Sequence, residues 1–136
     1  MRILLADAQA KVRFALRVLL ERQSGIEVVG EAASVEELLA RTAASCPDVV
    51  LLDWNVAGPV AAGLLLALRC DCPNLGVIVL SGRPEARAAA LAAGADAFVS
   101  KGYPPEHLMA AIQRCCRSTE MSAPGHLLPG EDVLAI

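Results

Sequence analysis

Five short apolar segments, separated by helical patterns, limit the fold of this chain more than any other feature. They read RILLA (2–6), IEVVG (26–30), DVVLLD (48–53), GVIVLS (76–81) and AFVSK (97–101). Segments this apolar are typical of strands covered on both faces, as in a parallel sheet. The alternation therefore predicts an α/β domain of the (βα)5 type, a doubly wound parallel sheet with helices on both sides.

The segments between these strands carry helix signals. A stripe at spacings of three and four predicts a first helix that Gly25 ends, formed by Val12, Leu16, Leu19 and Leu20. Ser34 and Glu37 predict a capping box at the start of a second helix over 34–44.

Three more helices are expected further along the chain. One runs from about Val60 to Arg69, and the next covers 83–94, with Pro84 near its first turn and Gly94 at its C-cap. The last begins at Pro104-Pro105 and has core residues at helical spacing, namely Leu108, Ala111, Ile112 and Cys115.

Length and composition bound the organisation of the chain. Its 136 residues suit one domain, which we expect over 1–117, with a linker-like or loosely ordered tail over 118–136. A hydrophobic content of 55% excludes a disordered chain. A net charge of −3 gives no reason to expect direct nucleic-acid binding, and no apolar run reaches membrane-spanning length. Without a visible signal peptide, we expect a soluble, cytoplasmic protein.

The chain has five cysteines, namely Cys46, Cys70, Cys72, Cys115 and Cys116. An odd count without a secretory signal argues against a disulfide framework. Neither close pair has the spacing of a zinc site. We therefore expect small, partly buried thiols.

Polar residues end four of the five predicted strands. These residues are Asp7, Asp53, Ser81 and Lys101. Ligands of open parallel sheets bind beyond the carboxyl ends of the strands, and in the flavodoxin-like strand order 2-1-3-4-5 the first and third strands are neighbours. Asp7 and Asp53 should then lie close together, which favours Mg²⁺ between them. A lysine and a hydroxyl opposite suit the transfer of a phosphoryl group to an aspartate.

Plainer interpretations of these residues stay open at this point. Asp7 and Asp53 could cap helices, Ser81 could belong to an ordinary turn, and Lys101 could be a solvated lysine. GPVAAG (58–63) lacks the Gly-Lys-Ser/Thr of a P-loop, and no G-x-G-x-x-G follows the first strand. These absences argue against a nucleotide-binding enzyme.

The motifs LLAD, PDVVLLDWN, VIVLSG and AGADAFVSK occur in this order over about residues 1–117. Together they resemble the response-regulator receiver domains of bacterial two-component systems. IEVVGEAAS is most similar to the subclass that usually carries a C-terminal helix-turn-helix domain and regulates transcription. GHLLPGEDVLAI (125–136) resembles the start of the linker to such a domain.

The resemblance implies a role for each site residue. Asp53 matches the phosphoacceptor, Lys101 the phosphate-binding lysine, and Asp7 an Mg²⁺ ligand together with Asp53 and the backbone carbonyl of Asn55. Ser81 matches the hydroxyl that contacts the phosphoryl group and starts the switch. Phe98 matches the aromatic switch position, although plain packing is an equal alternative.

Two departures from the family pattern stand out. Ala8 occupies the position of the second acid, which usually binds Mg²⁺ directly, so we expect weak Mg²⁺ binding. Ala57 replaces a proline in the segment WNVAGPVAAG, so the loop after Asp53 should be displaced.

The resemblance implies a signalling domain rather than an enzyme, with at most phosphoacceptor and autodephosphorylation chemistry. A sensor histidine kinase would phosphorylate Asp53 and thereby switch an output surface. That surface, built from helix 83–94, strand 97–101 and the last helix, would also support a homodimer. The alternative is a degenerate receiver that acts as a phosphorylation-independent interaction module. Neither hypothesis involves a membrane or direct nucleic-acid binding by this segment.

Overall fold

The computed structural model of the chain describes residues 1–102 and 104–121. Its five strands form one parallel sheet in the order β2-β1-β3-β4-β5. The strands are β1 (Arg2–Ala6), β2 (Glu27–Ala32), β3 (Val49–Asp53), β4 (Gly76–Ser81) and β5 (Ala97–Ser100). The predicted fold class and strand order are confirmed.

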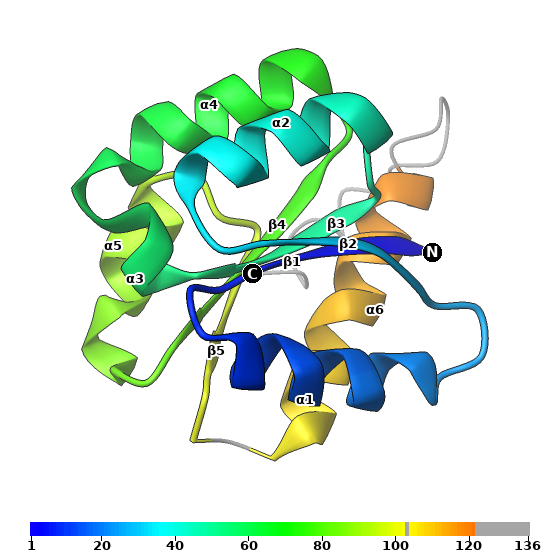
Figure 1. Cartoon of the computed structure of the whole chain (residues 1–136). Helices are drawn as coiled ribbons and strands as arrows, with labels where there is room; N and C mark the ends of the chain where they lie inside the picture. The colour runs from blue at the N-terminus through cyan, green and yellow to red at the C-terminus, as the bar shows by residue number, and fades with distance from the viewer. Residues whose placement is uncertain (103, 122–136) are drawn as a thin grey trace.

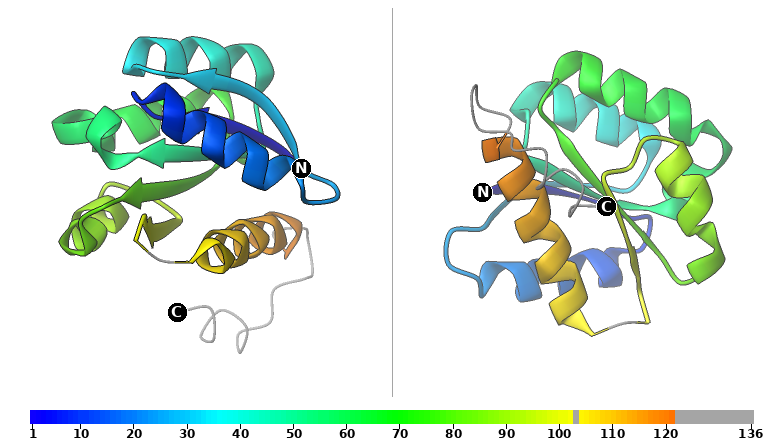
Figure 2. Two further views of the ribbon diagram at one scale, coloured as in Figure 1. Left: turned by 60° about the horizontal axis from the view of Figure 1, so that its bottom comes forward. Right: turned by 180° about the vertical axis from the view of Figure 1, so that it is seen from behind.

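Helices cover both faces of this sheet (Figures 1 and 2). The helices are α1 (Ala10–Glu21), α2 (Val35–Ser45), α3 (Trp54–Ala57), α4 (Ala61–Asp71), α5 (Arg87–Ala92) and α6 (Pro105–Met121), with 3₁₀ turns η1 (Gly58–Val60) and η2 (Pro84–Ala86). The core has two parts, because α2, α4 and α5 contribute to one cluster and α1 and α6 to the other. Alternate residues of each inner strand enter different clusters: Val50 and Leu52 face α2 and α4, while Val49 and Leu51 face α1 and α6.

The second strand is longer than predicted and contains an irregularity. It covers Glu27–Ala32 rather than 26–30, and its pairing with β1 shifts between Ile3 and Leu4. Gly30 then stands opposite Leu4, where an added Cβ would come 2.9 Å from Leu4 Cδ1. A side chain at position 30 would therefore require the Leu4 side chain to shift.

The helix ends follow the predicted signals with small differences. Ser34 Oγ accepts a hydrogen bond from the Glu37 amide at 3.3 Å, as the capping box requires. Glu37 reaches back one residue further than predicted and accepts from the Ala33 amide at 2.7 Å. The first helix ends at Glu21, before Gly25, and Ala93 rather than Gly94 is the C-cap of α5. Gly94 follows with a φ of 113°, which favours glycine.

Helix α6 begins at Pro105 and continues through Met121, so residues 118–121 of the expected tail are helical. The four predicted core positions of this helix, Leu108 to Cys115, are buried. The rest of the expected tail, including the linker-like segment 125–136, lies outside the described residues.

The cysteine prediction is wrong for two positions. Cys46 and Cys72 form a disulfide with a Cα–Cα distance of 5.5 Å. The expectation of thiols rested on the odd count and on local spacing. These two cysteines are 26 residues apart, and the packing of α2 beside α4 brings them together.

Candidate functional site

Asp7 and Asp53 lie at the carboxyl ends of the neighbouring strands β1 and β3, as predicted. Asp7 directly follows β1, and Asp53 is the last residue of β3. Their exposed fractions are only 2% and 4%. Neither carboxylate caps a helix: the N-cap of α1 is Gln9, and Asp53 makes no side-chain cap bond to α3. Asp7 Oδ1 instead accepts from the Gln9 amide at 2.8 Å, which fixes the carboxylate at the sheet edge.

Lys101 joins the two carboxylates directly. Its Nζ lies 3.0 Å from Asp7 Oδ2 and 2.9 Å from Asp53 Oδ1. Burial lowers the pKa of Lys101, but the hydrogen bonds and negative charges of Asp53 and Asp7 outweigh burial and raise it above its usual 10.5. The ammonium group is therefore charged at neutral pH and offsets the repulsion between the two acids. A merely solvated lysine is excluded by these contacts.

Ser81 lies on the strand next to Asp53, since Asp53 pairs with Leu80 across β3 and β4. Its side chain is 4% exposed, and its Oγ accepts from the Arg83 amide at 3.1 Å in a local turn. Its main-chain carbonyl accepts from the Lys101 amide at 2.8 Å. Ser81 therefore makes the contact expected of an ordinary turn serine. It also lies beside the end of β5, which positions Lys101.

One oxygen of Asp53 remains open. Asp53 Oδ1 accepts from Lys101, whereas Oδ2 accepts no hydrogen bond from any residue in the described part of the chain. Asp53 is 4% exposed, and among those residues Thr42 Oγ1 is the only fully buried side-chain N or O atom without a hydrogen-bond partner, so Asp53 Oδ2 keeps at most a small contact with solvent. An ionised carboxylate oxygen that is positioned yet accessible can act as a nucleophile.

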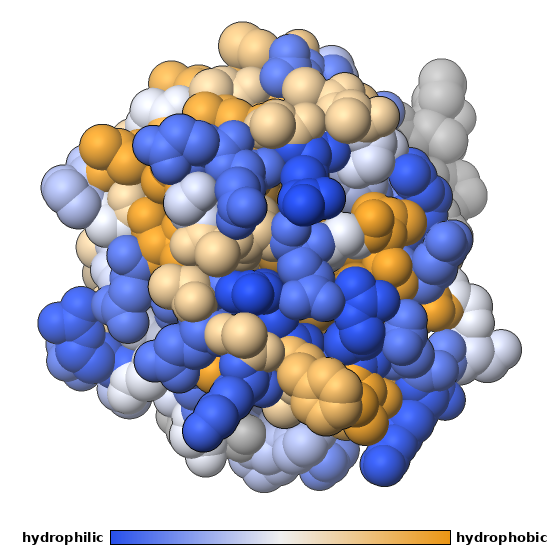
Figure 3. All heavy atoms as spheres, viewed as in Figure 1, coloured by the Kyte–Doolittle hydropathy of each residue, from blue (hydrophilic) through white to orange (hydrophobic). Residues whose placement is uncertain are grey.

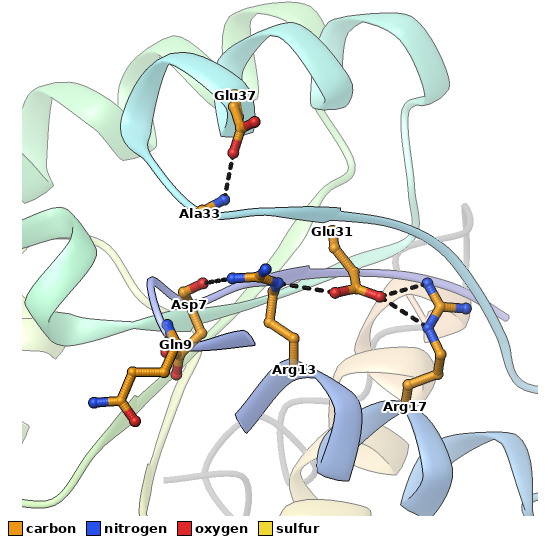
Figure 4. A network of polar contacts seen from close by, with 7 residues as sticks. All are labelled: Asp7, Gln9, Arg13, Arg17, Glu31, Ala33 and Glu37. Atoms are coloured by element: carbon orange, nitrogen blue, oxygen red, sulfur yellow. Dashed lines mark hydrogen bonds and ion pairs between the residues drawn. The ribbon is translucent and has the colours of Figure 1, made fainter. Parts of the chain in front are cut away.

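Sequence reasoning missed the polar network beside Asp7, which Figure 4 shows. The Arg13 guanidinium on α1 donates to the Asp7 carbonyl and, at 2.8 Å, to Glu31 on β2. Arg17 donates to Glu31 at 2.9 Å. Burial raises the pKa of Glu31, but the hydrogen bonds and charges of Arg13 and Arg17 outweigh it and hold that pKa below its usual value. Arg13 and Arg17 lie beside the predicted apolar stripe of α1 and are four residues apart. This spacing places both arginines on one face of the helix and was the sequence signal for the network.

Ser100 is a second residue that sequence reasoning missed. It is 6% exposed, pairs in register with Ser81, and its Oγ accepts from the Gly102 amide at 3.4 Å. It therefore shapes the turn that presents Lys101. Apart from the serine itself, nothing in the strand sequence AFVS marked Ser100 as a residue of the site.

The remaining predicted site residues lie close by in sequence but differ in exposure. Ala8 is exposed, and Asn55 is exposed within α3. Phe98 is 8% exposed and packs in the core cluster with α2, α4 and α5. The segment after Asp53, which we expected to be a displaced loop, forms the short helix α3 followed by η1.

The donor set at this edge fits a hard divalent cation. Two buried carboxylates 2.9 and 3.0 Å from one ammonium nitrogen already bind a cation between them. Oxygen ligands of this kind suit Mg²⁺, which keeps several waters. No group of three or more His, Cys, Asp or Glu side chains with metal-binding geometry exists among residues 1–102 and 104–121. Ala8 explains why the set stops at two acids.

Known proteins with a similar sequence are response regulators. The family model for the response regulator receiver domain matches residues 3–113. Response regulator protein VraR of Staphylococcus aureus is 28% identical over 125 residues, which cover 90% of this chain and 60% of VraR. Response regulator UvrY of Escherichia coli O157:H7 is 32% identical over 113 residues, which cover 82% of this chain and 52% of UvrY. The chain thus spans between 52% and 60% of the length of these relatives.

Solved structures agree with this match. A two-component response regulator of the LuxR family from Aurantimonas sp. SI85-9A1 has a TM-score of 0.76 and 29% identity, covering 86% of this chain and 85% of that protein. The receiver domain of NarL from Mycobacterium tuberculosis has a TM-score of 0.75 and 27% identity, covering 85% of this chain and 95% of that domain.

No described helix is long and apolar enough to cross a membrane. The matched residues 3–113 include β2 to β5, all of β1 except Arg2, and the strand-end residues Asp7, Asp53, Ser81 and Lys101. Sequence, sheet order and strand-end chemistry therefore lead to one assignment: the chain belongs to the response regulator receiver domain family.

Proposed function

We propose that this receiver accepts a phosphoryl group on Asp53 from the phosphohistidine of a sensor histidine kinase. The observation that carries the proposal is the state of Asp53, whose Oδ1 accepts a hydrogen bond from Lys101 while Oδ2 accepts none from the described residues. In the transfer, Oδ2 forms the bond to phosphorus as the bond between phosphorus and the donor imidazole breaks. The imidazole nitrogen keeps the electron pair of that bond.

Lys101 and Ser81 serve the phosphorylated state. The Lys101 ammonium contacts Asp53 at 2.9 Å and can follow negative charge from the carboxylate to the phosphoryl oxygens. Ser81 gives up its bond to the Arg83 amide and donates its hydroxyl to the phosphoryl group, which shifts the turn after β4. Phe98 lies on β5, the strand next to β4, and lines the hollow beside α6, so its rearrangement would complete a population shift between two arrangements of the output face.

Asp7, Asp53 and the Asn55 carbonyl are the residues that would hold Mg²⁺. The ion, when bound, neutralises negative charge on the carboxylates and the phosphoryl oxygens. Since Ala8 supplies no ligand, water fills that position and the affinity is low. Lys101 must also leave Asp7 before a second cation binds there, because it occupies the space between the acids.

The kinase docks over α1 and the start of α6 in this proposal. A cavity of about 430 Å³ lies between these helices, next to Lys101, and is lined by Leu16, Leu19, Pro105 and Leu108 among others. Apolar side chains also gather on the surface over α1 (Figure 3), where Phe14 is 68% exposed and Val18 is 38% exposed. An apolar surface beside an accessible nucleophile suits a protein phosphodonor.

The output face supports a homodimer of the phosphorylated form. The hollow on α5, β5 and α6 has a volume of about 390 Å³ and is lined by Arg87, Glu106 and Arg114, with Phe98 at its base. A two-fold axis places each patch against its own copy, so Arg87 of one protomer can meet Glu106 of the other. The segment itself makes no nucleic-acid contact in this proposal, in keeping with its net charge of −3.

Beryllofluoride with Mg²⁺ tests the proposal, since Trp54 adjoins Asp53 and reports on the site by its fluorescence. We expect saturable quenching of Trp54 at millimolar Mg²⁺ and no quenching in Asp53→Asn. Mass spectrometry after acetyl phosphate should show one phosphoryl group on Asp53. Absence of both signals at high Mg²⁺ would contradict the proposal and leave a phosphorylation-independent module.

Ala8→Asp tests the reason given for weak metal binding. The variant restores the second acid, so we expect roughly tenfold tighter Mg²⁺ binding, equivalent to about 1.4 kcal/mol. Titration of Mg²⁺ at fixed beryllofluoride measures this change, and Ala8→Asn, which adds an oxygen without charge, is the matched control. Equal affinity in all three proteins would mean that Ala8 is not the cause.

A further inference from the structure

The two bonded cysteines stand at equivalent places on neighbouring helices. Cys46 is the C-cap of α2 and Cys72 the C-cap of α4, and these helices lie side by side on one face of the sheet (Figure 1). Their exposures differ: Cys46 is exposed, whereas Cys72 is 5% exposed. Solutes therefore reach one sulfur of the pair far more easily than the other.

The backbone at Cys46 makes cysteine an unusual choice there. Its φ of 41° lies in the left-handed region, and it is the only residue other than glycine with a positive φ in the described part of the chain. Helix ends of this kind normally use glycine or asparagine, because a Cβ is unfavourable there. Packing does not account for the residue, since the side chain is exposed. Its side chain is instead bonded covalently to Cys72.

We propose that Cys46 and Cys72 form an oxidation site that closes reversibly on reaction with a peroxide. The Cys46 thiol loses its proton, the thiolate attacks one peroxide oxygen, and the oxygen–oxygen bond breaks. Cys46 sulfenic acid and hydroxide form, and the hydroxide takes up the proton from the thiol to give one water. The Cys72 thiolate then attacks the Cys46 sulfur, and hydroxide leaves to be protonated to a second water. Two thiols are thus oxidised and one hydrogen peroxide is reduced to two waters.

The opened form also has partners for both thiols. Cys46 Sγ lies 3.5 Å from the Asp71 carbonyl oxygen, and Cys72 Sγ lies 3.4 Å from the Thr42 carbonyl oxygen. Each carbonyl can accept a weak hydrogen bond from the thiol once the sulfur–sulfur bond is reduced. Because Cys46 is exposed, a dithiol reductant can attack it, and exposed disulfides are the more reducible kind.

Closure acts on the helices α2 and α4 rather than on the phosphoacceptor. Both helices end at the sheet edge where the strands begin, so the bond lies at the edge opposite Asp53. The bond closes a loop across a sequence separation of 26, which restricts the unfolded chain and stabilises the fold. For a loop and a domain of this size we expect the Tm to rise by roughly 5–10 °C.

The test compares the whole chain reduced with dithiothreitol and then treated with hydrogen peroxide. We expect peptide mapping to show Cys46 joined to Cys72, two fewer cysteines open to alkylation, and the rise in Tm. Renewed reduction should reverse all three changes. Cys70→Ser is the matched control, since Cys70 is exposed and only two residues from Cys72 but outside the bond, and it should behave like the wild type.

Two further measurements separate the roles of the cysteines. In Cys72→Ser, a dimedone probe should label the sulfenic acid at Cys46, whereas Cys46→Ser should gain no Tm on oxidation. The proposal is overturned if oxidation joins other cysteines in preference, or if the closed and opened wild-type proteins have the same Tm. The comparison of the two wild-type forms needs no variant and decides the question even if a substitution impairs folding.

Discussion

At the scale of single residues, Lys101 supplies the positive charge that balances the carboxylates of Asp7 and Asp53. Its contacts with Asp7 and Asp53 join the end of β5 to the ends of β1 and β3. Its folded-state pKa is raised, so its contribution to stability is fully present below pH 10.5 and is lost as the pH rises through the raised value. The site therefore keeps a cation in place at all physiological pH values.

Lys101→Met should lower the free energy of unfolding by about 2–4 kcal/mol at pH 7, because it leaves two buried carboxylates without a cation. Part of that loss should return at millimolar Mg²⁺, which can replace the ammonium between Asp7 and Asp53. Urea unfolding with and without Mg²⁺ measures both effects. Lys11→Met, at an exposed lysine of α1, is the matched control and should change little. An unaltered stability in Lys101→Met would contradict the bridging role.

The sequence predicted the four polar residues at the strand ends because the position of a strand end follows from the apolar run before it. Asp7, Asp53, Ser81 and Lys101 come directly at or after such runs. Arg13 was not predicted as a neighbour of Asp7, because a long side chain on a helix can reach many places. The bond between Cys46 and Cys72 could not be predicted, because their pairing depends on how two helices pack.

At the scale of the elements, Glu31 joins β2 to α1. It accepts hydrogen bonds from Arg13 and Arg17, one turn apart on the same face of α1. Since Arg13 also donates to the carbonyl of Asp7, the helix is tied both to β2 and to the residue that follows β1. The orientation of α1 and the position of Asp7 thus depend on one small network.

Glu31→Gln should lower the free energy of unfolding by about 1 kcal/mol at pH 7, a modest value because the carboxylate is 32% exposed and partly screened. The folded-state pKa of Glu31 lies below its usual 4.5, so its stabilisation is present above pH 4.5 and is lost as the pH falls through the lowered value. Wild type and variant should therefore converge in acid. Denaturant unfolding at several pH values follows this convergence.

Glu21→Gln is the matched control for this prediction. Glu21 also pairs with Arg17, but at 3.3 Å and with a side chain that is 48% exposed. We expect a smaller effect than that of Glu31→Gln. If the two variants lose the same stability at pH 7, the contact between α1 and β2 contributes nothing beyond an ordinary surface ion pair.

The order of the elements could be predicted from the sequence, because short apolar runs mark the strands and apolar residues at spacings of three and four mark the helices. The bulge in β2 could not, because the register between β1 and β2 is set by pairing between two strands and not by a local sequence pattern. The short helix α3 replaced an expected loop, since WNVA has no proline to prevent a helical turn.

On the scale of the whole molecule, the helices of the domain leave one charged, hollowed face at α5, β5 and α6. Opposite charges within one patch can make it self-complementary, as a two-fold contact between identical copies requires. The edge that carries Asp53 lies at the end of the same sheet, and β4 pairs directly with β5. In the proposed function, a change at Ser81 would reach this face through these two strands.

Arg87→Glu should weaken dimerisation of the beryllofluoride-activated protein roughly tenfold, because Glu106 of the other protomer then faces a like charge. The double variant with Glu106→Arg restores opposite charges and should recover most of the affinity. Sedimentation of the activated protein measures the monomer–dimer equilibrium. Arg83→Glu, at an exposed arginine that does not line the hollow, serves for comparison. Failure of the double variant to recover would remove this face as the dimer contact.

The bond between Cys46 and Cys72 also changes the covalent connectivity of the chain. It closes a ring that contains β3 and Asp53, while Lys101 lies outside it. The exposed turn of Pro59 and Val60 belongs to this ring. A protease that cuts there leaves one covalent molecule as long as the sulfurs stay joined. After reduction the same cut yields two pieces, with Asp53 on one and Lys101 on the other. The redox state of the two cysteines therefore decides whether the two parts of the site can separate once the chain has been cut.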